Sequence, residues 1–532
     1  MNVSEAIAAM LMADEIQSIF TLPGSSCLSL LDSIRARGAR IVLTGNEPSA
    51  VHAAHAYSAT RSAGYGCAVL SRGPGAINGA VGIATASDGF PVLVIAGDNE
   101  TRWRGRDVVN QDLPLGRVLA GLCDVFDISS PDESIECLQA ARRVLFEQRR
   151  SCVLIVPSDV ATAEIPVGAA PAPSSALEPR AAARRVRPGI LKSAKRPFVI
   201  WGRSVAECEE ATRAAARFIA SRPDIPTAVT MRGLSNIPSG TWGLVGAMGE
   251  PELNNELLQS DLLVVVGENL RAESTGSLDE FHAGRFVLSI GPSAERQRYV
   301  QAGAEVECDV DSLPHWIDRL HEELPVREST VGPPLMPLTE TEDLVRLVID
   351  EVQPSVVTLD SGQNFFVAAR ALSRARGRRV VYSDTQGTMG FAVPAALGAG
   401  IALNASTLAV VGDGGLLMTL SELPAIADAA LPILLLVLDN SSLGMVRATQ
   451  LARSMHPVAT SLPSLRWSNI AATFGFSYHE IANTCDTRSV PIGRPAIVRI
   501  AVPDSLRLMS RGSVRLPLPV EAWDKHAHSQ PL

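Results

Sequence analysis

Short runs of apolar residues, each closed by glycine, serine or aspartate, recur along the chain and constrain its fold more than any other feature. Such uninterrupted apolarity is typical of strands that are covered on both faces, as in parallel sheets. Helix-forming stretches lie between many of the runs, for example over residues 47–61, 204–219 and 416–430. Alternating strands and helices predict an α/β architecture. The clearest runs are residues 41–44, 67–71, 91–97, 152–159, 197–202, 262–268, 286–291, 356–362, 380–384, 408–414, 433–440 and 496–502.

Two segments interrupt this alternation. Residues 161–185 are rich in Ala and Pro and have no core-forming period, which predicts a linker, and residues 324–338 predict a second one. We therefore expect three doubly wound parallel-sheet domains and a loosely ordered tail. Their predicted bounds are 1–160, 186–323 and 339–515 for the domains and 516–532 for the tail.

Charge and composition exclude several classes of protein. The chain has 532 residues and a formal net charge of −9, which argues against a nucleic-acid or anionic-membrane partner. No apolar run approaches the ~20 residues that a bilayer-spanning helix needs, and the N-terminus lacks the basic segment of a signal peptide. The eight cysteines are scattered, without a C-x-x-C pair, and are expected to be reduced thiols. These features predict a cytoplasmic protein.

Polar residues follow two predicted strands that are consecutive in the sequence. Asp413 lies where one strand ends and a helix begins, and Asn440 ends the next strand, so we expect both at the same edge of the sheet. The Asp413 carboxylate, the Asn440 amide oxygen and the Ser442 backbone carbonyl would supply three of the six oxygens that Mg²⁺ prefers. A diphosphate could supply two more. The glycines that would let phosphate approach the backbone are Gly412, Gly414 and Gly415, although G-D-G-G alone is also an ordinary turn.

This spacing resembles the diphosphate–Mg²⁺ motif of thiamine-diphosphate (ThDP) enzymes, G-D-G followed after about two dozen residues by N-N. Asp439 replaces the first Asn, and the metal-binding second one is kept as Asn440. Residues 386–398, Q-G-T-M-G-F-A-V-P-A-A-L-G, are similar to the acetolactate-synthase branch of that family. Alone, they would also fit a Gly-rich turn with a core methionine.

The resemblance implies roles for further residues of the third predicted domain. Met389 would wedge between the two rings of the cofactor, and Gly387 would offer its carbonyl to the aminopyrimidine. The loop D-S-G-Q-N at residues 360–364 resembles the one that binds the diphosphate from the other side, and residues 443–447 follow the pattern Q-G-M-V with Leu in place of Gln. The implied cofactor-binding residues of these two segments are Ser361, Gln363, Asn364, Leu443, Gly444 and Met445.

Glu47 follows the predicted strand 41–44 and opens a helix, with Pro48 in the first turn. Considered alone, such a residue is often a solvated first-turn acid. The family resemblance places here the glutamate that hydrogen-bonds the cofactor's pyrimidine nitrogen and so promotes removal of the C2 proton. Residues 71–78, S-R-G-P-G-A-I-N, resemble the family's T-S-G-P-G-A-T-N loop. The resemblance therefore implies that Glu47 is catalytic.

Three residues are candidates for substrate binding. Ser25 directly follows Pro23-Gly24, where benzoylformate decarboxylase-like members contact the substrate carboxylate, although a serine here could equally cap a helix. Gln111 resembles the glutamine of the F-Q-E stretch of acetolactate synthases. Arg72 replaces the usual serine, and could clamp a carboxylate or pair with an acid at a subunit interface.

The resemblance covers residues 1–515 and implies an assembly as well as an activity. The cofactor would bridge the first domain of one subunit and the last domain of another, so we expect at least a homodimer and a homotetramer as the fuller assembly. The expected activity is ThDP- and Mg²⁺-dependent decarboxylation of a 2-oxo acid, or formation or cleavage of an acyloin-type C–C bond. No nucleic-acid or membrane partner is expected.

Two alternatives stay open. Flavin-binding relatives carry G-x-R-F-D-D where this chain has G-E-N-L-R at residues 267–271, and Arg271 without the aspartates does not predict an FAD site. An FAD-linked oxidase is therefore one alternative. The other is a non-catalytic subunit, against which the joint retention of Glu47, Asp413 and Asn440 speaks.

Overall fold

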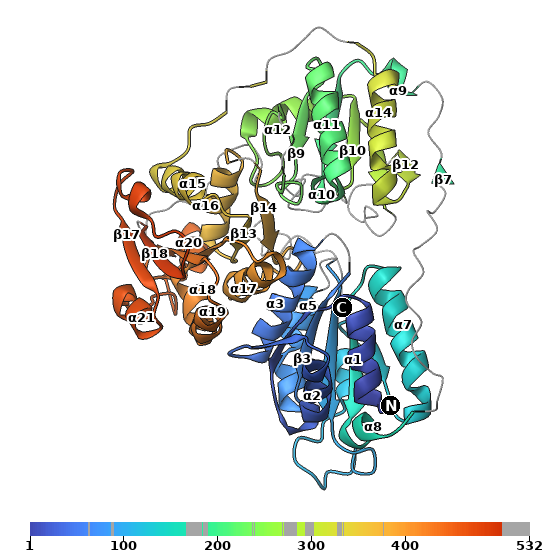
Figure 1. Ribbon diagram of the computed structural model, residues 1–532. Coiled ribbons are helices and arrows are strands. Elements are labelled where there is room, and N and C mark those ends of the chain that lie inside the picture. The colour runs from blue at the N-terminus through green and yellow to red at the C-terminus, as the bar shows by residue number, and fades with distance from the viewer. Residues whose placement is uncertain are drawn as a thin grey trace.

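Three six-stranded sheets follow one another along the chain, each in its own domain (Figure 1). This architecture comes from a computed structural model, and it confirms the predicted α/β class. Neighbouring strands pair in parallel in all three sheets, except at β7, a two-residue antiparallel edge of the middle sheet. The structure describes residues 1–61, 64–86, 90–165, 183–184, 190–236, 238, 240–268, 270, 285–292, 303–326, 332–333, 335–375 and 377–502.

The N-terminal sheet is flanked by helices on both faces. Its strands, in spatial order, are β2 (Arg40–Leu43), β1 (Ser18–Leu22), β3 (Gly66–Leu70), β4 (Val92–Asp98), β6 (Cys152–Pro157) and β5 (Asp124–Asp127). Its helices are α1 (Val3–Ala13), α2 (Leu28–Ala36), α3 (Glu47–Thr60), α4 (Pro74–Asn78), α5 (Ala80–Thr85), α6 (Leu115–Leu119), α7 (Ser134–Phe146) and α8 (Ser158–Thr162).

The middle sheet has the order β7 (Ala183–Arg184), β12 (Ala304–Glu307), β11 (Phe286–Gly291), β10 (Leu262–Val266), β8 (Pro197–Trp201) and β9 (Thr227–Val229). Its described helices are α9 (Ile190–Ser193), α10 (Arg203–Glu207), α11 (Glu209–Ser221), α12 (Pro251–Leu258) and α14 (Leu313–Glu323). The predicted helix over 204–219 is thus two helices, because Cys208 between them has an extended backbone.

The C-terminal sheet has the order β14 (Arg379–Tyr382), β13 (Val356–Leu359), β15 (Thr407–Gly412), β16 (Ile433–Asp439), β18 (Ala496–Ala501) and β17 (Ser477–Ile481). Its helices are α15 (Glu340–Val352), α16 (Gln363–Leu372), α17 (Ala392–Leu403), α18 (Asp413–Met418), α19 (Leu423–Ala429), α20 (Gly444–Ala452) and α21 (Trp467–Thr473). The predicted helix over 416–430 is broken after Met418, because Pro424 lacks the N–H that a continuous helix would need and instead lies in the first turn of α19.

The predicted segments between and after the domains are only partly described. Of the linker predicted at 161–185, residues 166–182 and 185 lie outside the described residues, and the whole predicted tail, 516–532, does so too. Residues 161–165 pack on the N-terminal domain, where Ile165 is buried and its N–H donates to the Met1 carbonyl. In the second predicted linker, 324–338, residues 327–331 and 334 are not described.

Helix α3 is buried along nearly its whole length, because it lies between its own sheet and α17 of the C-terminal domain (Figure 1). A Cβ atom on Gly66 of β3 would lie 1.9 Å from the Ala54 carbonyl oxygen, and one on Gly398 of α17 would lie 1.9 Å from the Ala53 carbonyl oxygen. Only glycine allows backbones to approach this closely. One turn of α3 is therefore in backbone contact with its own sheet on one side and with the C-terminal domain on the other.

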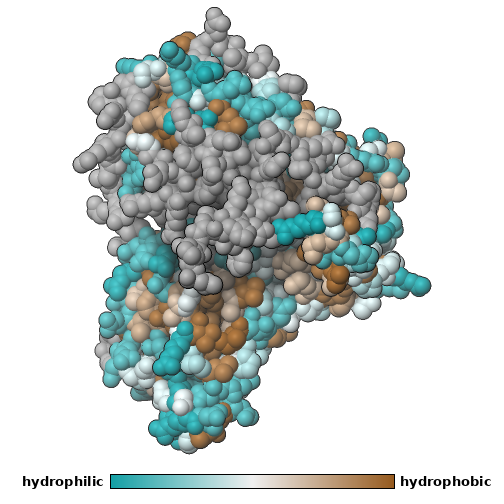
Figure 2. Space-filling model, turned by 180° about the vertical axis from the view of Figure 1, so that it is seen from behind, coloured by the Kyte–Doolittle hydropathy of each residue, from teal (hydrophilic) through white to brown (hydrophobic). Residues whose placement is uncertain are grey.

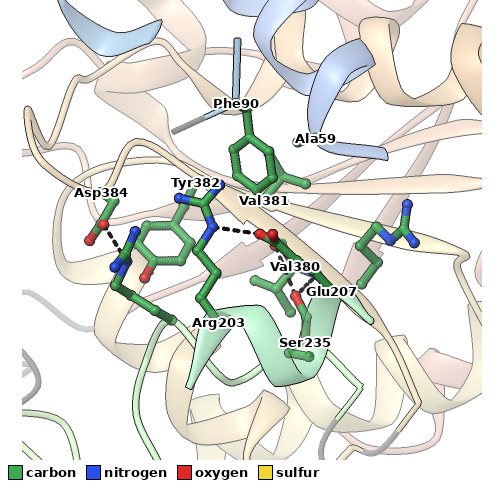
Figure 3. Close-up of a pocket in the computed structure, with 12 residues that line it drawn as sticks. Ala59, Phe90, Arg203, Glu207, Ser235, Val380, Val381, Tyr382 and Asp384 are labelled. Atoms are coloured by element: carbon green, nitrogen blue, oxygen red, sulfur yellow. Dashed lines mark hydrogen bonds and ion pairs between the residues drawn. The ribbon is translucent and has the colours of Figure 1, made fainter. Parts of the chain in front are cut away.

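Charged side chains join the three domains at a second place, around the pocket that Figure 3 shows. Arg203 follows β8 and forms an ion pair with Glu207, with 2.5 Å between Nε and Oε1. Its Cζ atom lies 3.7 Å from the ring centroid of Phe90 in the N-terminal domain. Arg232 follows β9 and forms an ion pair of 2.8 Å with Asp384 of the C-terminal domain. The contact of Arg203 with Phe90 and the ion pair of Arg232 with Asp384 therefore fasten the middle domain to both neighbours.

Among the described residues, no helix combines the length and the apolarity that crossing a membrane requires.

The packing of α3 predicts how stability depends on pH. His52 and His55 of α3 are buried, and within the described part of the chain their ring nitrogens have no hydrogen-bond partner. Burial lowers the pKa of His52 to about 4, and burial together with the nearby Arg203 lowers that of His55 to about 3. Below a pH of about 6.5 these histidines bind protons in the unfolded chain but stay neutral in the folded one. The free energy of unfolding therefore falls as the pH drops towards 4, by on the order of 3 kcal/mol per histidine.

Chemical unfolding at a series of pH values checks this expectation. The double variant His52→Leu/His55→Leu should show a flatter decline of the free energy of unfolding between pH 6.5 and 4. The exposed His456→Leu should decline as the unmodified protein does. An unchanged slope in the double variant would contradict the assignment.

Candidate active site

A pocket opens at the carboxyl edge of the C-terminal sheet, and all its lining residues come from that domain. It contains every cofactor- and metal-binding residue predicted for this domain except Gly387. The strands β13, β15 and β16 end beside it, which is where ligands bind in doubly wound sheets. The lining residues are Ser361, Gly362, Gln363, Asn364, Val367, Met389, Gly412, Asp413, Gly414, Gly415, Leu438, Asn440, Ser442, Leu443, Gly444, Met445, Val446 and Val502.

Asp413 and Asn440 converge on one backbone amide. The Ser442 N–H lies 3.2 Å from Oδ2 of Asp413 and 3.1 Å from Oδ1 of Asn440, so these two oxygens are neighbours. Asn440 is oriented by its own amide group, whose Nδ2 donates to Oε1 of Gln363 at 3.1 Å. Burial raises the pKa of Asp413 to about 6. A cation bound beside this carboxylate would favour its charged form.

The donor set fits a hard divalent cation, because carboxylate and amide oxygens are the ligands that Mg²⁺ accepts. The buried hydroxyl of Ser442 has no hydrogen-bond partner among the described residues, which is consistent with a polar ligand at this place. A Cβ atom on Gly444 would lie 2.1 Å from Oε1 of Gln363, so the backbone here leaves no room for a side chain. The site has one carboxylate, and among the described residues no group of three or more His, Cys, Asp or Glu side chains is placed to hold a metal.

Asp439, which departs from the family motif, points to different partners. Its carboxylate accepts hydrogen bonds from Nε1 of Trp467 at 2.9 Å and from Nε of Arg499 at 2.8 Å. Burial opposes its ionisation, but the bonds from Arg499 and Trp467 outweigh this and lower its pKa. Asp439 is therefore a structural anion that ties β16 to α21 and β18.

Asp360, at the end of β13, connects two of the predicted cofactor-binding segments. Its fully buried carboxylate accepts from the Gly390 N–H at 2.9 Å and from the Ala392 N–H at 3.1 Å, on either side of the turn that follows Met389. Burial raises its pKa to about 7 although these backbone amides act in the opposite direction. The sequence reasoning missed this role, and its only signal was an acid at the end of a buried strand.

Glu47 lies at the start of α3, at the carboxyl edge of the N-terminal sheet. Asn46 caps the helix by accepting from the Ser49 N–H at 2.9 Å. The half-buried Glu47 carboxylate accepts from Nδ2 of Asn78 at 2.5 Å, and Gly75 lies close to its other oxygen. Asn78, at the end of α4, is a neighbour that sequence reasoning did not assign.

The predicted substrate residues lie around the same edge but play unequal parts. Ser25 is exposed and is the first residue of a 3-10 helix (Ser25–Cys27), so it does not cap this helix as the alternative had it; Gly24 holds that position. Its neighbour Ser26 is buried and accepts from the Arg72 N–H at 3.1 Å. The side chains of Arg72 and Gln111 are joined by a hydrogen bond of 3.1 Å from Nε to Oε1.

Within one chain, the two groups of predicted residues do not share a pocket. The described contacts of the Glu47 carboxylate are with its own domain, and no residue before Ser361 lines the C-terminal pocket. Helix α20 begins at that pocket with Gly444 and Met445, yet it has no buried residue. Its Val446 and Leu451 are each more than half exposed.

Comparisons with known proteins agree with this geometry. Residues 1–116 match the family description "Thiamine pyrophosphate enzyme, N-terminal TPP binding domain", residues 189–313 match its central domain, and residues 360–490 match its C-terminal TPP binding domain. Together these matches span more than half of the chain.

Similar curated proteins are acetolactate synthase large subunits. The probable large subunit of Methanocaldococcus jannaschii is 29% identical over 489 residues, covering 84% of this chain and 81% of that protein. The isozyme 2 large subunit of Escherichia coli (strain K12) is 28% identical over 476 residues, with 85% of each chain covered. The isozyme 1 large subunit of the same organism is 25% identical over 515 residues, covering 91% of this chain and 90% of that protein.

The two bonds of Asp360 predict that this carboxylate fixes the Met389 turn. In Asp360→Asn, the single amide oxygen can accept from only one of the two backbone N–H groups, and the new NH₂ group faces the other. We expect faster hydrogen exchange at Gly390 and Ala392 and a loss of about 1–3 kcal/mol in the free energy of unfolding.

Hydrogen exchange followed by mass spectrometry measures the first effect directly. Asp350→Asn, at a partly exposed ion pair on α15, is the matched control and should leave exchange over residues 387–392 unchanged. Unaltered exchange in Asp360→Asn would show that the turn is held without this carboxylate.

Proposed function

Since the chain belongs to the thiamine pyrophosphate enzymes and is of the acetolactate synthase type, we propose that it is a ThDP- and Mg²⁺-dependent lyase or carboligase. It would decarboxylate a 2-oxo acid, or make or cleave the C–C bond of an acyloin. The observation that carries this proposal is the convergence of Asp413 and Asn440 on the Ser442 amide, beside a backbone too crowded for side chains.

The C-terminal pocket would hold the diphosphate end of the cofactor. Asp413, Asn440 and the Ser442 carbonyl would bind Mg²⁺, and the glycines from Gly412 to Gly415 would admit the phosphates. Met389 lines the same pocket and would support the bent form of the cofactor, with its turn fixed by Asp360. When bound, ThDP would serve as the electron sink for the bond that breaks next to the substrate's 2-oxo group.

Glu47 would act on the pyrimidine end. Its carboxyl group would hydrogen-bond a ring nitrogen of the cofactor and hold the proton that drives the change of tautomer. Asn78 already donates to one carboxylate oxygen and thereby orients the group, which leaves the other oxygen for the ring. Exclusion of water from the closed site would strengthen this bond.

The separation of the two groups of residues supports a site shared between two copies of the chain, and hence at least a homodimer. Figure 2 shows apolar side chains gathered on the lower lobe, which is the N-terminal domain, and on the C-terminal domain beside it. Large exposed apolar side chains of these two domains include Leu43, Val81, Val118, Met418, Val446, Leu451 and Met455. A second copy would cover such side chains and the open helix α20.

The two alternatives differ from this proposal in measurable ways. An FAD-linked oxidase would carry a flavin in the middle domain, but Arg271, its one candidate contact, lies outside the described residues. Glu268, in the same segment, is buried and tied to Thr230 and Arg232, which favours a structural role. A flavin-free absorption spectrum of the active protein would exclude the oxidase. A non-catalytic subunit would have no use for the oriented Glu47.

Glu47→Gln should abolish turnover while ThDP still binds, because the amide keeps the shape of the side chain but cannot hold the acidic proton. Turnover is measured as CO₂ release from 2-oxo acids, with and without an acceptor aldehyde, and binding is measured by calorimetry. We expect a loss of at least about 100-fold in kcat, the scale of a general acid–base contribution. Full activity in this variant would refute the assignment.

Asp413→Ala should instead lose Mg²⁺ and ThDP together. Its matched control is Asp428→Ala, at an exposed acid on α19. This control should bind ThDP in the presence of Mg²⁺ as the unmodified protein does. Normal ThDP affinity in Asp413→Ala would count against the metal site.

A further inference from the structure

Arg72 is a fixed cation at the carboxyl edge of the N-terminal sheet. It lies in the loop between β3 and α4, and its backbone N–H donates to the buried Ser26 hydroxyl at 3.1 Å. Its Nε donates to Oε1 of Gln111, also at 3.1 Å. A guanidinium held through Nε presents its two terminal nitrogens together, which is the arrangement that grips a carboxylate through two hydrogen bonds.

The backbone next to Arg72 and the backbone of Gln111 lie in close contact. Gly73 and Gln111 both have positive φ angles, of 55° and 63°, and a Cβ atom on Gly73 would lie 2.6 Å from the Gln111 carbonyl oxygen. The loop that brings Gln111 here is closed by Asp112, whose carboxylate accepts from the N–H groups of Gly105, Arg106 and Asp107, each at 3.0 Å. A non-glycine residue held firmly at a positive φ, as Gln111 is, is typical of ligand-binding sites.

Arg72 is close to Glu47 without being its partner. Both belong to the same loop cluster, since Gly75, three residues after Arg72, lies beside Oε1 of Glu47, and Asn78 holds Oε2. Within the described residues Arg72 forms no ion pair, and the bond to Gln111 is its only side-chain hydrogen bond. No acid of the described chain neutralises it, so its charge is available to a ligand.

The chemistry of decarboxylation decides which part of a ligand this cation should hold. When CO₂ leaves, the negative charge of the reacting carboxylate moves onto the neighbouring carbon. A guanidinium bound to that carboxylate would stabilise the starting state more than the transition state and slow the step. A cation paired with a second carboxylate, which keeps its charge throughout, improves binding without this penalty.

We infer that Arg72, positioned by Gln111 and Ser26, binds a second, non-reacting carboxylate of the substrate, so that the substrates are 2-oxo acids with a terminal carboxylate. This inference rests on the proposed function and specifies its substrate class. It also explains why an arginine stands in a loop whose other polar side chains are small.

Equilibrium binding tests the inference without turnover. The holoenzyme is titrated with glutarate and with pentanoate, which match in length, lack the oxo group and differ in the second carboxylate. Glutarate should bind more tightly, and Arg72→Gln should weaken it by about 10- to 100-fold, the value of a paired charge, while pentanoate changes little. Arg72→Lys should recover part of the loss. Arg35→Gln, in an exposed ion pair on α2, is the control and should leave the binding of both acids unchanged.

Equal binding of the two acids by the unmodified protein would overturn the inference. Dissociation of the dimer on Arg72→Gln would also overturn it, because Arg72 would then belong to the subunit interface.

Turnover is then compared between 2-oxoglutarate and 2-oxopentanoate. Loss of Arg72 should raise KM for the first by a much larger factor than KM for the second. If neither acid releases CO₂ although the glutarate preference holds, the proposed function fails and the carboxylate site stands.

Discussion

The whole arrangement depends on the backbone contact of helix α3 with its two neighbours. Because Gly66 and Gly398 have no side chains, the strand β3 and the helix α17 approach the carbonyls of Ala54 and Ala53 to a distance that any Cβ atom would prevent. One helix is thereby fixed to the sheet of the first domain and to a helix of the last. Glu47 begins that helix, so its position is set by packing and not by a flexible loop.

This packing has a consequence for the active site. Helix α17 carries at its start the turn that contains Met389, and Asp360 fixes that turn to the loop after β13. Each half of the site is therefore rigid within its own domain. In one chain, however, the C-terminal pocket is lined by its own domain alone, and α20 beside it lacks a covering surface. A second copy that supplies Glu47 to this pocket would satisfy both observations.

The sequence predicted the fold class because the central strands are continuous apolar runs, and it predicted α3 almost to its last residue. It missed β1, in which Ser18 and Thr21 interrupt the apolar run, although that strand lies inside the sheet. It also missed the edge strands β5, β9 and β17 and the short β12 and β7. β5 and β17 are only partly buried and need fewer apolar residues, and β9 has only three residues, so periodicity does not reveal them.

The candidate site could be foreseen where it depends on local pattern. The glycines and Asp413 stand at a strand end, and the return of Asn440 beside them follows from strand–helix–strand geometry. The contacts of Asn78, Ser26 and Asp360 could not be foreseen, because each joins segments whose distance in space depends on tertiary packing. The ion pairs that fasten the middle domain, such as Arg232 with Asp384, were beyond reach for the same reason.

The central claim is that each active site combines Glu47 of one copy with Asp413 of another, and mixing two inactive variants tests it most directly. Glu47→Gln and Asp413→Ala are co-refolded in equal amounts and assayed for CO₂ release. If sites are shared, half of the dimers are mixed and each has one intact site, so about a quarter of the unmodified activity should return. If each chain carried a complete site of its own, every site would keep one defect, and the mixture would stay inactive.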